Sequence, residues 1–278
     1  MPTSIADHSR TAPVSLTGLL RAARHQQRLS QLDLSLALGI STRHLGFVEV
    51  GRSRPSRQLL LRWLEHLQVP LGTRNQALCL AGYAPAYDES PLASQELDEA
   101  RAALAHLLDS HDPFPAVVID SDWAIQATNS GFRRLVHACG STLDLPAEVG
   151  QFTTERVTLI DLVLAPDGIG AALINLMDVA PAFLTHLRHD ALTNPRLEVV
   201  IEQVEALLPP RQPPVKFPPA LITRYATTEG ELSFLSMFTT FGTPQSITLA
   251  SLRVELMFPA NSHTSRLMAR HALNHAQR

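Results

Sequence analysis

Apolar residues in the N-terminal third of the chain recur at the three- and four-residue intervals of short amphipathic helices. Residues 15–28 place Leu16, Leu19, Leu20 and Ala23 on one stripe. Polar capping residues and glycines divide the chain between residues 29 and 82 into segments that are equally short. The further helices that we expect span 31–38, 42–50, 57–67 and 74–82, opened by Ser30, Ser41, Ser56 and Thr73. Five short helices with tight connections predict one compact helical bundle.

Beyond residue 112 the pattern changes to short β-rich segments separated by helical ones. The expected strands lie at 115–120, 123–128, 221–227, 231–242 and 247–258. The first two of these strands form one hairpin and the next two form another, while a proline-rich segment at 209–219 interrupts the helices between them. This order predicts an α+β domain in which helices cover one face of an antiparallel sheet.

Charge divides the chain at about residue 90. Residues 1–90 hold ten arginines and six acidic residues, a formal charge of +4, whereas residues 91–278 hold 13 basic and 20 acidic residues, a charge of −7. The first part is therefore attracted to a polyanion and the second is not. The chain has no run of 18 uncharged apolar residues and no apolar secretory signal at its start, so we expect a cytoplasmic protein without a membrane span.

Residues 30–57 (SQLDLSLALGISTRHLGFVEVGRSRPSR) have the spacing of two short helices that cross at a glycine turn and lead into a basic loop. Ser35 lies at the expected crossing, where a small side chain lets the helices approach. Gly39 lies at the turn, where we expect a left-handed backbone. The residues spaced to form one shared core are Leu34, Leu38, Ile40, Leu45 and Val48. Such a unit presents its second helix to the major groove of DNA.

The outward face of that second helix carries the residues expected to read base edges. Arg43 is suited to donate two hydrogen bonds to guanine, and Thr42 and Phe47 to contact thymine methyl groups. Gln31 begins the preceding helix, where it can meet a phosphate. The full DNA-contacting set that we expect is Gln31, Ser41, Thr42, Arg43, Phe47, Arg52, Ser53, Arg54 and Arg57. The last four follow the helix and are expected to bind the DNA backbone, which sets affinity and its salt dependence.

Over residues 15–85 the chain resembles the Xre/Cro-type repressor family, whose domain is a λ-repressor-like bundle of five helices. The resemblance implies double-stranded DNA as the partner. It also implies a structural pair, because Arg24 and Glu49 match the positions of an ion pair between the first and third helices of the family. A homodimer of such units binds two half-sites that lie one helical turn, or a multiple of it, apart.

A second resemblance covers roughly residues 16–260. The segments STRHLGFVEV, GRSRPSR, GYAP, FPAVVIDSDWAIQATNSGFRRLV, DLVLAPDGIGAALINLMDVAPAFLTHLRHDAL and ELSFLSMFTTFGTPQSITLASLRVELMFP resemble MmyB-like transcription regulators. This resemblance implies a PAS-like sheet with a pocket for a small, apolar, fatty-acid-like ligand, and hence a bacterial regulator whose DNA binding responds to that ligand. Leu176 departs from the family pattern, which often has tryptophan at this place after asparagine.

The segment 231–242 is apolar on both of its faces, so one face meets a helix and the other meets a second layer or a ligand. We expect an apolar pocket with one or two polar anchors for a carboxylate. The candidate lining and anchoring residues are Asn129, Phe132, Leu173, Asn175, Leu176, Phe183, Arg224, Tyr225, Phe234, Phe238 and Arg253. We expect no metal and no cofactor other than such a ligand.

The fold class that we predict is multidomain, α plus α+β. It combines a five-helix helix-turn-helix bundle with a PAS-like antiparallel sheet covered by helices. The expected boundaries are an arm at 1–14, the DNA-binding domain at 15–88, a linker helix at 89–111 and the ligand-binding domain at 112–278. The linker leucines that we expect to face a partner are Leu97, Leu104, Leu107 and Leu108.

Three other interpretations stay open for the second domain. These interpretations are a dimerisation platform without a ligand, an enzyme, and a light- or haem-sensing domain. No GxSxG, P-loop or HExxH motif favours catalysis. The pairs His186/His189 and His271/His275 have spacings that suit a metal but also suit solvated histidines. Whether residues 261–278 are ordered is left open.

Overall fold

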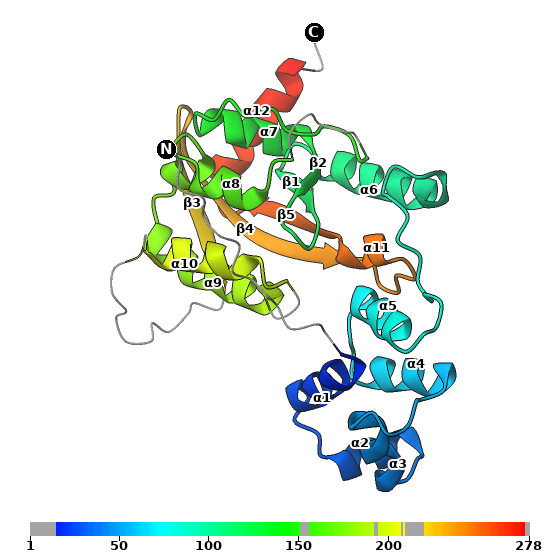
Figure 1. Ribbon diagram of the computed structural model, residues 1–278. Coiled ribbons are helices and arrows are strands. Elements are labelled where there is room, and N and C mark those ends of the chain that lie inside the picture. The colour runs from blue at the N-terminus through cyan, green and yellow to red at the C-terminus, as the bar shows by residue number, and fades with distance from the viewer. Residues whose placement is uncertain (1–14, 151–155, 192–193, 207, 209–219, 276–278) are drawn as a thin grey trace, which may run out of the picture. The chain divides into compact units, whose positions relative to one another are not determined.

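The computed structural model describes residues 15–150, 156–191, 194–206, 208 and 220–275. The chain forms two compact units, residues 1–88 and 89–278 (Figure 1). The arm expected at 1–14 and the proline-rich segment at 209–219 lie outside the described residues, as do the side chains of His271 and His275. Among the described residues no helix is long and apolar enough to cross a membrane.

Residues 15–88 fold into five short helices, as predicted. These are α1 (Leu16–Gln26), α2 (Gln31–Leu38), α3 (Thr42–Glu49), α4 (Arg57–His66) and α5 (Leu71–Leu80). The prediction that α5 opens at Thr73 is wrong, because the helix begins at Leu71 directly after Pro70. A helix start suits proline, since the missing N–H has no partner there in any case.

Local signals fix the crossing of α2 and α3. Ser30 and Asp33 form a reciprocal capping box at the start of α2, and Gly39 ends this helix in the left-handed conformation (φ 66°), as expected. The predicted shared core is confirmed: Leu34, Leu38, Leu45 and Val48 are buried, and Ile40 packs against them. The side chain of Ser35 is buried at the crossing. This core fixes the position of α3 relative to α2, with its outward face away from the core.

The second unit is a five-stranded antiparallel sheet with helices. Its strands are β1 (Ala116–Ile119), β2 (Ile125–Thr128), β3 (Ile222–Thr227), β4 (Gly230–Thr240) and β5 (Arg253–Pro259), in the order β2-β1-β5-β4-β3. Its α-helices are α6 (Asp98–His111), α7 (Ser130–Ala138), α8 (Leu159–Leu164), α9 (Leu176–Ala191), α10 (Leu197–Ala206), α11 (Ile247–Ser251) and α12 (Ser262–His275), with 3-10 turns η1 (Gln95–Leu97) and η2 (Ile169–Ala172). Both predicted hairpins are confirmed.

The two faces of the sheet support two separate cores, because successive side chains of a strand point to opposite sides. The inner face carries Val117, Phe234 and Met257 and packs against α7, α8, α9 and α10. The outer face carries Val118 and Val254 and packs against α6. Figure 1 shows α9 and α10 side by side. The inner face is the one that bounds the large pocket of this unit.

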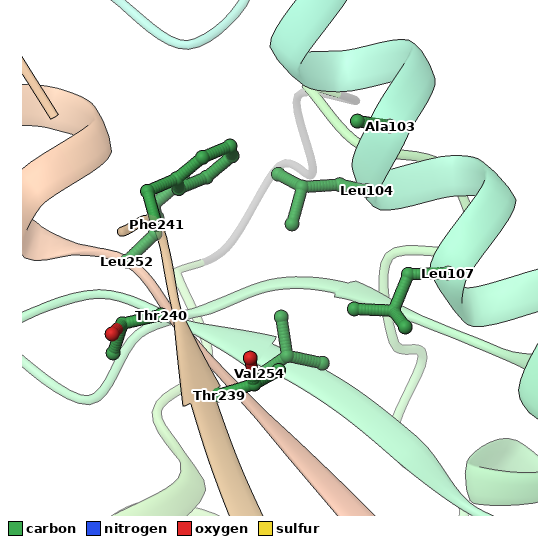
Figure 2. A pocket seen from close by; sticks show the side chains of 8 residues that line it. All are labelled: Ala103, Leu104, Leu107, Thr239, Thr240, Phe241, Leu252 and Val254. Carbon is green, nitrogen blue, oxygen red and sulfur yellow. The ribbon is translucent and has the colours of Figure 1, made fainter. Parts of the chain in front are cut away.

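The helix α6 packs on the sheet of its own unit. Figure 2 shows Leu104 and Leu107 directed toward Phe241 and Val254, with a small hollow of about 110 Å³ between them. Leu104 and Leu108 are buried in this core, as is Leu97 before the helix. For Leu97, Leu104 and Leu108 the expectation that they face a partner is therefore wrong, because they are buried in the core of their own unit, whereas Leu107 is only partly buried.

Two further boundaries differ from the expected ones. The expected linker helix begins only at Asp98, behind the short turn η1. The expected strand at 247–258 is divided into α11 and β5. Ser246 opens α11, and only the residues from Arg253 onward pair with β4 and β1. Residues 247–252 of the expected strand have a composition that is common in strands, but pairing with β4 begins only at Arg253.

Candidate functional site

The outward face of α3 forms the floor of a shallow hollow at the surface of the first unit. Its lining residues are Gln31, Thr42, Arg43, Gly46, Phe47, Val50 and Arg52. Arg43 is exposed, and its guanidinium lies 5.3 Å from the centroid of the Phe47 ring. A contact at this distance between a guanidinium and an aromatic ring is attractive and limits the movement of the Arg43 side chain. An exposed arginine held in this way is suited to the edge of a guanine.

Two residues of the expected DNA-contacting set also hold the helix in place. The Ser41 hydroxyl caps α3 by accepting a hydrogen bond from the N–H of His44 at 3.1 Å. The Thr42 hydroxyl lies 2.9 Å from that of Ser35, which ties α3 to α2 at their crossing. Each hydroxyl therefore has a structural role as well as a place at the start of the helix.

Beneath the helix lies a buried ion pair. Arg24 Nε and Nη2 donate to the two carboxylate oxygens of Glu49 at 2.8 and 2.9 Å, and Glu49 is fully buried. Burial alone raises the pKa of the Glu49 carboxyl, but hydrogen bonds from Arg24 and Gln31 outweigh it and hold the pKa below its usual value. The structure thus brings together the two residues that the family resemblance pairs.

Gln31 is placed differently from what we expected. Its side-chain amide donates to Glu49 Oε2 at 2.9 Å, so it completes the shell of the buried carboxylate. The expectation that this side chain meets a phosphate is corrected, because its donor is turned inward. Gln31 nevertheless lines the hollow next to α3.

The basic loop after α3 has one residue that is tied down. Arg54 Nη2 donates to the carbonyl of Gly82 at 3.1 Å, and its guanidinium lies 4.4 Å from the centroid of the Tyr83 ring. Arg54 therefore holds the loop to the end of α5, a role that we did not expect. Arg52 and Arg57 are exposed, and Ser53 is half-buried with its N–H bonded to the carbonyl of Phe47.

The second unit contains an apolar pocket of about 700 Å³ on the inner face of the sheet. Its walls come from α8, η2, α9, α10 and strands β3, β4 and β5. Six residues of the expected ligand-binding set line it, namely Phe132, Leu173, Leu176, Phe183, Tyr225 and Phe238. A pocket of this size and character is typical of a site for a small ligand.

The two asparagines that we expected as anchors are bound within the fold instead. Asn129 caps α7, and its side chain also bonds backbone groups of α6 and β1. Asn175 donates to the carbonyl of Ile222 at 2.8 Å and accepts from the N–H of Arg224 at 3.0 Å, which fastens the chain before α9 to the edge strand β3. Neither lines the pocket, so both anchor expectations are corrected.

The remaining three residues of the expected set also lie outside the lining. Arg224 pairs with Glu231 on the surface at 2.7 Å. Phe234 is fully buried in the core beside Tyr225. Arg253 pairs with Asp190 at 2.7 Å, and its guanidinium lies 4.3 Å from the centroid of the Trp123 ring. Arg253 therefore packs against Trp123 and Phe238, which line the pocket, without lining it itself.

Sequence reasoning missed two ionisable residues that do line the pocket, Glu255 and His186. Burial raises the pKa of the Glu255 carboxyl, and the nearby charge of Arg253 acts in the opposite direction. Burial lowers the pKa of His186, and the charge of Arg253 acts in the same direction. Both shifts favour the uncharged form. Their only signal in the sequence was two polar residues within apolar segments.

Two protein families match the chain. The MmyB-like transcription regulator ligand binding domain matches residues 100–270, and the helix-turn-helix domain matches residues 20–73. None of the curated proteins compared with the chain matches it. A solved structure titled "Structure of an RNA-binding Light-Oxygen-Voltage Receptor" is similar at 14% identity, covering 94% of this chain and 62% of that chain. Its TM-score of 0.28 is too low to indicate a common fold.

These matches agree with the geometry of both units. The helix-turn-helix match lies on the bundle that exposes Arg43, and the ligand-binding match contains the sheet and its apolar pocket. The match to the ligand-binding domain spans more than half of the chain. The chain therefore belongs to the MmyB-like transcription regulators, and it combines a helix-turn-helix DNA-binding unit with a ligand-binding unit.

Proposed function

We propose that the outward face of α3 reads DNA sequence in the major groove, with Arg43 as the main base-contacting residue. The exposure of Arg43 and its support by Phe47 favour this role. Thr42 and Phe47 are placed to contact neighbouring bases, and the N-terminus of α3 at Ser41 faces the DNA backbone. Arg52, Ser53 and Arg57 add backbone contacts, which supply affinity without sequence preference.

We propose that the pocket of the second unit holds a small, elongated, apolar molecule of fatty-acid-like size and shape. The single observation that carries this is the cavity of about 700 Å³, whose walls are mostly aliphatic and aromatic. The order β2-β1-β5-β4-β3 supports a PAS-like description of the sheet that bounds it. Filling such a cavity removes apolar surface from water on both protein and ligand.

The ligand regulates DNA binding only if it binds one arrangement of the DNA-binding units more tightly than another. We propose that the protein acts as a cytoplasmic homodimer, in which two copies of α3 meet successive half-sites. The spacing of half-sites in such dimers is one helical turn or a multiple of it. A ligand that changes the distance between the two copies of α3 then changes affinity for both half-sites together.

The alternative is a dimerisation platform without a ligand. The outer face of the sheet gives this alternative some support, because Ile222 and Phe258 are large apolar residues on it that are 42% and 36% exposed. Exposed apolar side chains on one face are suited to a contact between proteins. A platform does not need an open pocket on the inner face, however, so the cavity favours the ligand.

Blocking the pocket is expected to abolish ligand binding. Ala182 lines the pocket from α9, and Ala182→Trp places an indole in it, whereas Thr185→Trp on the exposed side of the same helix leaves it open. Native mass spectrometry and solvent extraction of the purified protein should find an apolar molecule in the wild type and in Thr185→Trp. Ala182→Trp should hold at least about tenfold less. A wild-type protein that neither retains nor takes up any apolar molecule contradicts the proposal and favours the platform.

A further inference from the structure

A glycine lies in the middle of α3, the helix whose outward face carries Arg43. Gly46 lines the surface hollow of the first unit together with Arg43, Phe47 and Val50. Glycine is a poor helix former, because it has no side chain to pack and loses more backbone freedom on folding than any other residue. In a helix of only eight residues, this cost stays uncompensated unless Gly46 has another role.

The fold itself does not require a glycine at this position. A Cβ atom added to Gly46 would meet Gln31 Oε1 at 3.7 Å, which is an ordinary van der Waals distance. The backbone of Gly46 is helical and does not have a positive φ. Gly131 in α7 shows the contrast, because a Cβ atom there would lie 2.5 Å from the carbonyl oxygen of Pro113. The room at Gly46 is therefore available to a partner outside the bundle.

The neighbours of Gly46 on the outward face are cationic on one side and apolar on the other. Arg43 and Val50 lie one helical turn before and after it, and residues at these spacings are neighbours on a helix surface. The side chain of Val50 is 59% exposed, and the Phe47 ring is half-buried beside the guanidinium of Arg43. We call the space above Gly46 that is bordered by Arg43, Phe47 and Val50 the Gly46 notch.

The dimensions of DNA give such a notch a use. An α-helix with its side chains is about 10–12 Å across and the major groove is about 12 Å wide, so a docked helix fills the groove closely. Where a side chain is missing, the edge of a base can approach the helix backbone. The C5-methyl group of thymine is the group in the major groove that needs an apolar partner rather than a hydrogen bond. Phe47 and Val50 offer that partner.

We propose that Gly46 is a specificity-determining residue, because its missing side chain leaves a contact site for the C5-methyl group of a thymine between Phe47 and Val50. That thymine lies next to the base that Arg43 contacts, since Arg43 borders the same notch. This inference rests on the proposed function, because it assumes that the outward face of α3 enters the major groove. It adds the kind of base that is recognised beside the one at Arg43.

Replacing thymine by uracil in the DNA removes the methyl group alone. The duplex that the full-length wild type selects from a random pool is synthesised with each thymine changed to deoxyuridine in turn, and fluorescence anisotropy gives each dissociation constant at fixed salt. We expect one thymine in each half-site whose change weakens binding about fourfold, which corresponds to the loss of one buried methyl group. A scan in which no thymine methyl group affects affinity overturns the proposal.

Gly46→Leu tests the notch from the side of the protein. Leucine fills the notch and is a better helix former, so the variant should be at least as stable as the wild type in melting curves. Its preference for the selected duplex over a scrambled one should fall about tenfold or more. The uracil change that weakens binding of the wild type should then have no effect, because the methyl group has already lost its contact site.

Gln76→Leu is the matched control, since it adds a leucine at an exposed position on α5 outside the hollow. It should keep both the preference and the effect of uracil. A Gly46→Leu protein that keeps its preference overturns the proposal. So does one that unfolds more readily than the wild type, because the fold would then need the glycine.

Arg43→Ala separates the failure of this inference from that of the proposed function. If Arg43→Ala loses the preference and Gly46→Leu keeps it, α3 reads DNA and only the role of the Gly46 notch is wrong. If both variants keep the preference, the outward face of α3 does not read the bases, and both proposals fail.

Discussion

Arg24→Ala is expected to lower the stability of the DNA-binding unit by about 3–5 kcal/mol, because it leaves the Glu49 carboxylate buried without its cation. Gln31 would remain as a partner, but a neutral amide does not compensate a buried charge. Arg43→Ala on the exposed face of α3 should change stability by less than about 0.5 kcal/mol.

Hydrogen exchange followed by mass spectrometry measures this difference, since it reports on peptides of residues 15–88 separately from those of the second unit. The amides of α1 and α3 should lose protection in Arg24→Ala and keep it in Arg43→Ala. Replacing both members of the pair, Arg24→Met with Glu49→Leu, should recover much of the loss, because no charge is then buried. Equal protection in the two single variants contradicts the account.

The same ion pair gives the destabilisation a pH dependence. The pKa of Glu49 in the folded protein lies below its ordinary value of 4.5, so its contribution is complete above about pH 4.5 and is lost as the pH falls through the folded pKa. In Arg24→Ala the burial of Glu49 remains and the main opposing interaction is gone, so its pKa rises. The stability difference between wild type and variant is therefore largest near neutral pH and shrinks in acid.

Asn129→Ala is expected to destabilise the second unit by about 3 kcal/mol or more. The side-chain oxygen of Asn129 accepts from the N–H groups of Ala116 and Phe132, both at 2.9 Å, and its amide donates to the carbonyls of Leu108 and Phe114 at 3.3 and 2.7 Å. These groups belong to α6, β1, α7 and the segment between α6 and β1. Alanine leaves buried donors and acceptors without partners, at about 1–3 kcal/mol each.

Asn175→Ala is the matched control. The Asn175 side chain also bonds backbone groups, but only two of them, and at an exposed position where water can replace the lost hydrogen bonds. Its loss should cost about 1 kcal/mol or less. Exchange protection of β1 and α7, measured on the full-length chain in mild urea, distinguishes the two variants. If Asn129→Ala costs no more than Asn175→Ala, the interpretation of Asn129 as the joint between α6, β1 and α7 is wrong.

The sequence predicts the DNA-binding bundle well because its signals are local. The capping box at Ser30, the glycine turn at Gly39 and the small residue at Ser35 act within a few residues of themselves. The start of α5 was misplaced because Thr73 resembles a cap, while Pro70 fixes the backbone earlier. The inward turn of Gln31 was missed because its partner Glu49 lies on another helix.

The pocket was predicted as a class of site, but not in its polar detail. The large apolar residues Phe132 and Phe183 line the cavity, as expected. Glu255 was missed because Arg253-Val-Glu-Leu-Met alternates in the way that usually marks a strand with one face in solvent. Only the fold shows that this polar face of β5 points inward, where Arg253 is paired with Asp190. The structural roles of Asn129 and Asn175 were missed because most of their backbone partners belong to other helices or strands.

The sequence preference of Arg43→Ala tests most directly the claim that the outward face of α3 reads the bases of DNA. The full-length wild type selects its preferred duplex from a random pool, and affinities for that duplex and for a scrambled one are then compared at fixed salt. We expect the ratio to fall about 5- to 150-fold in Arg43→Ala, which corresponds to the loss of one bidentate base contact. Arg57→Ala should weaken binding to both duplexes alike and flatten the salt dependence. An Arg43→Ala protein with an unchanged ratio would show that this face of α3 does not read the bases.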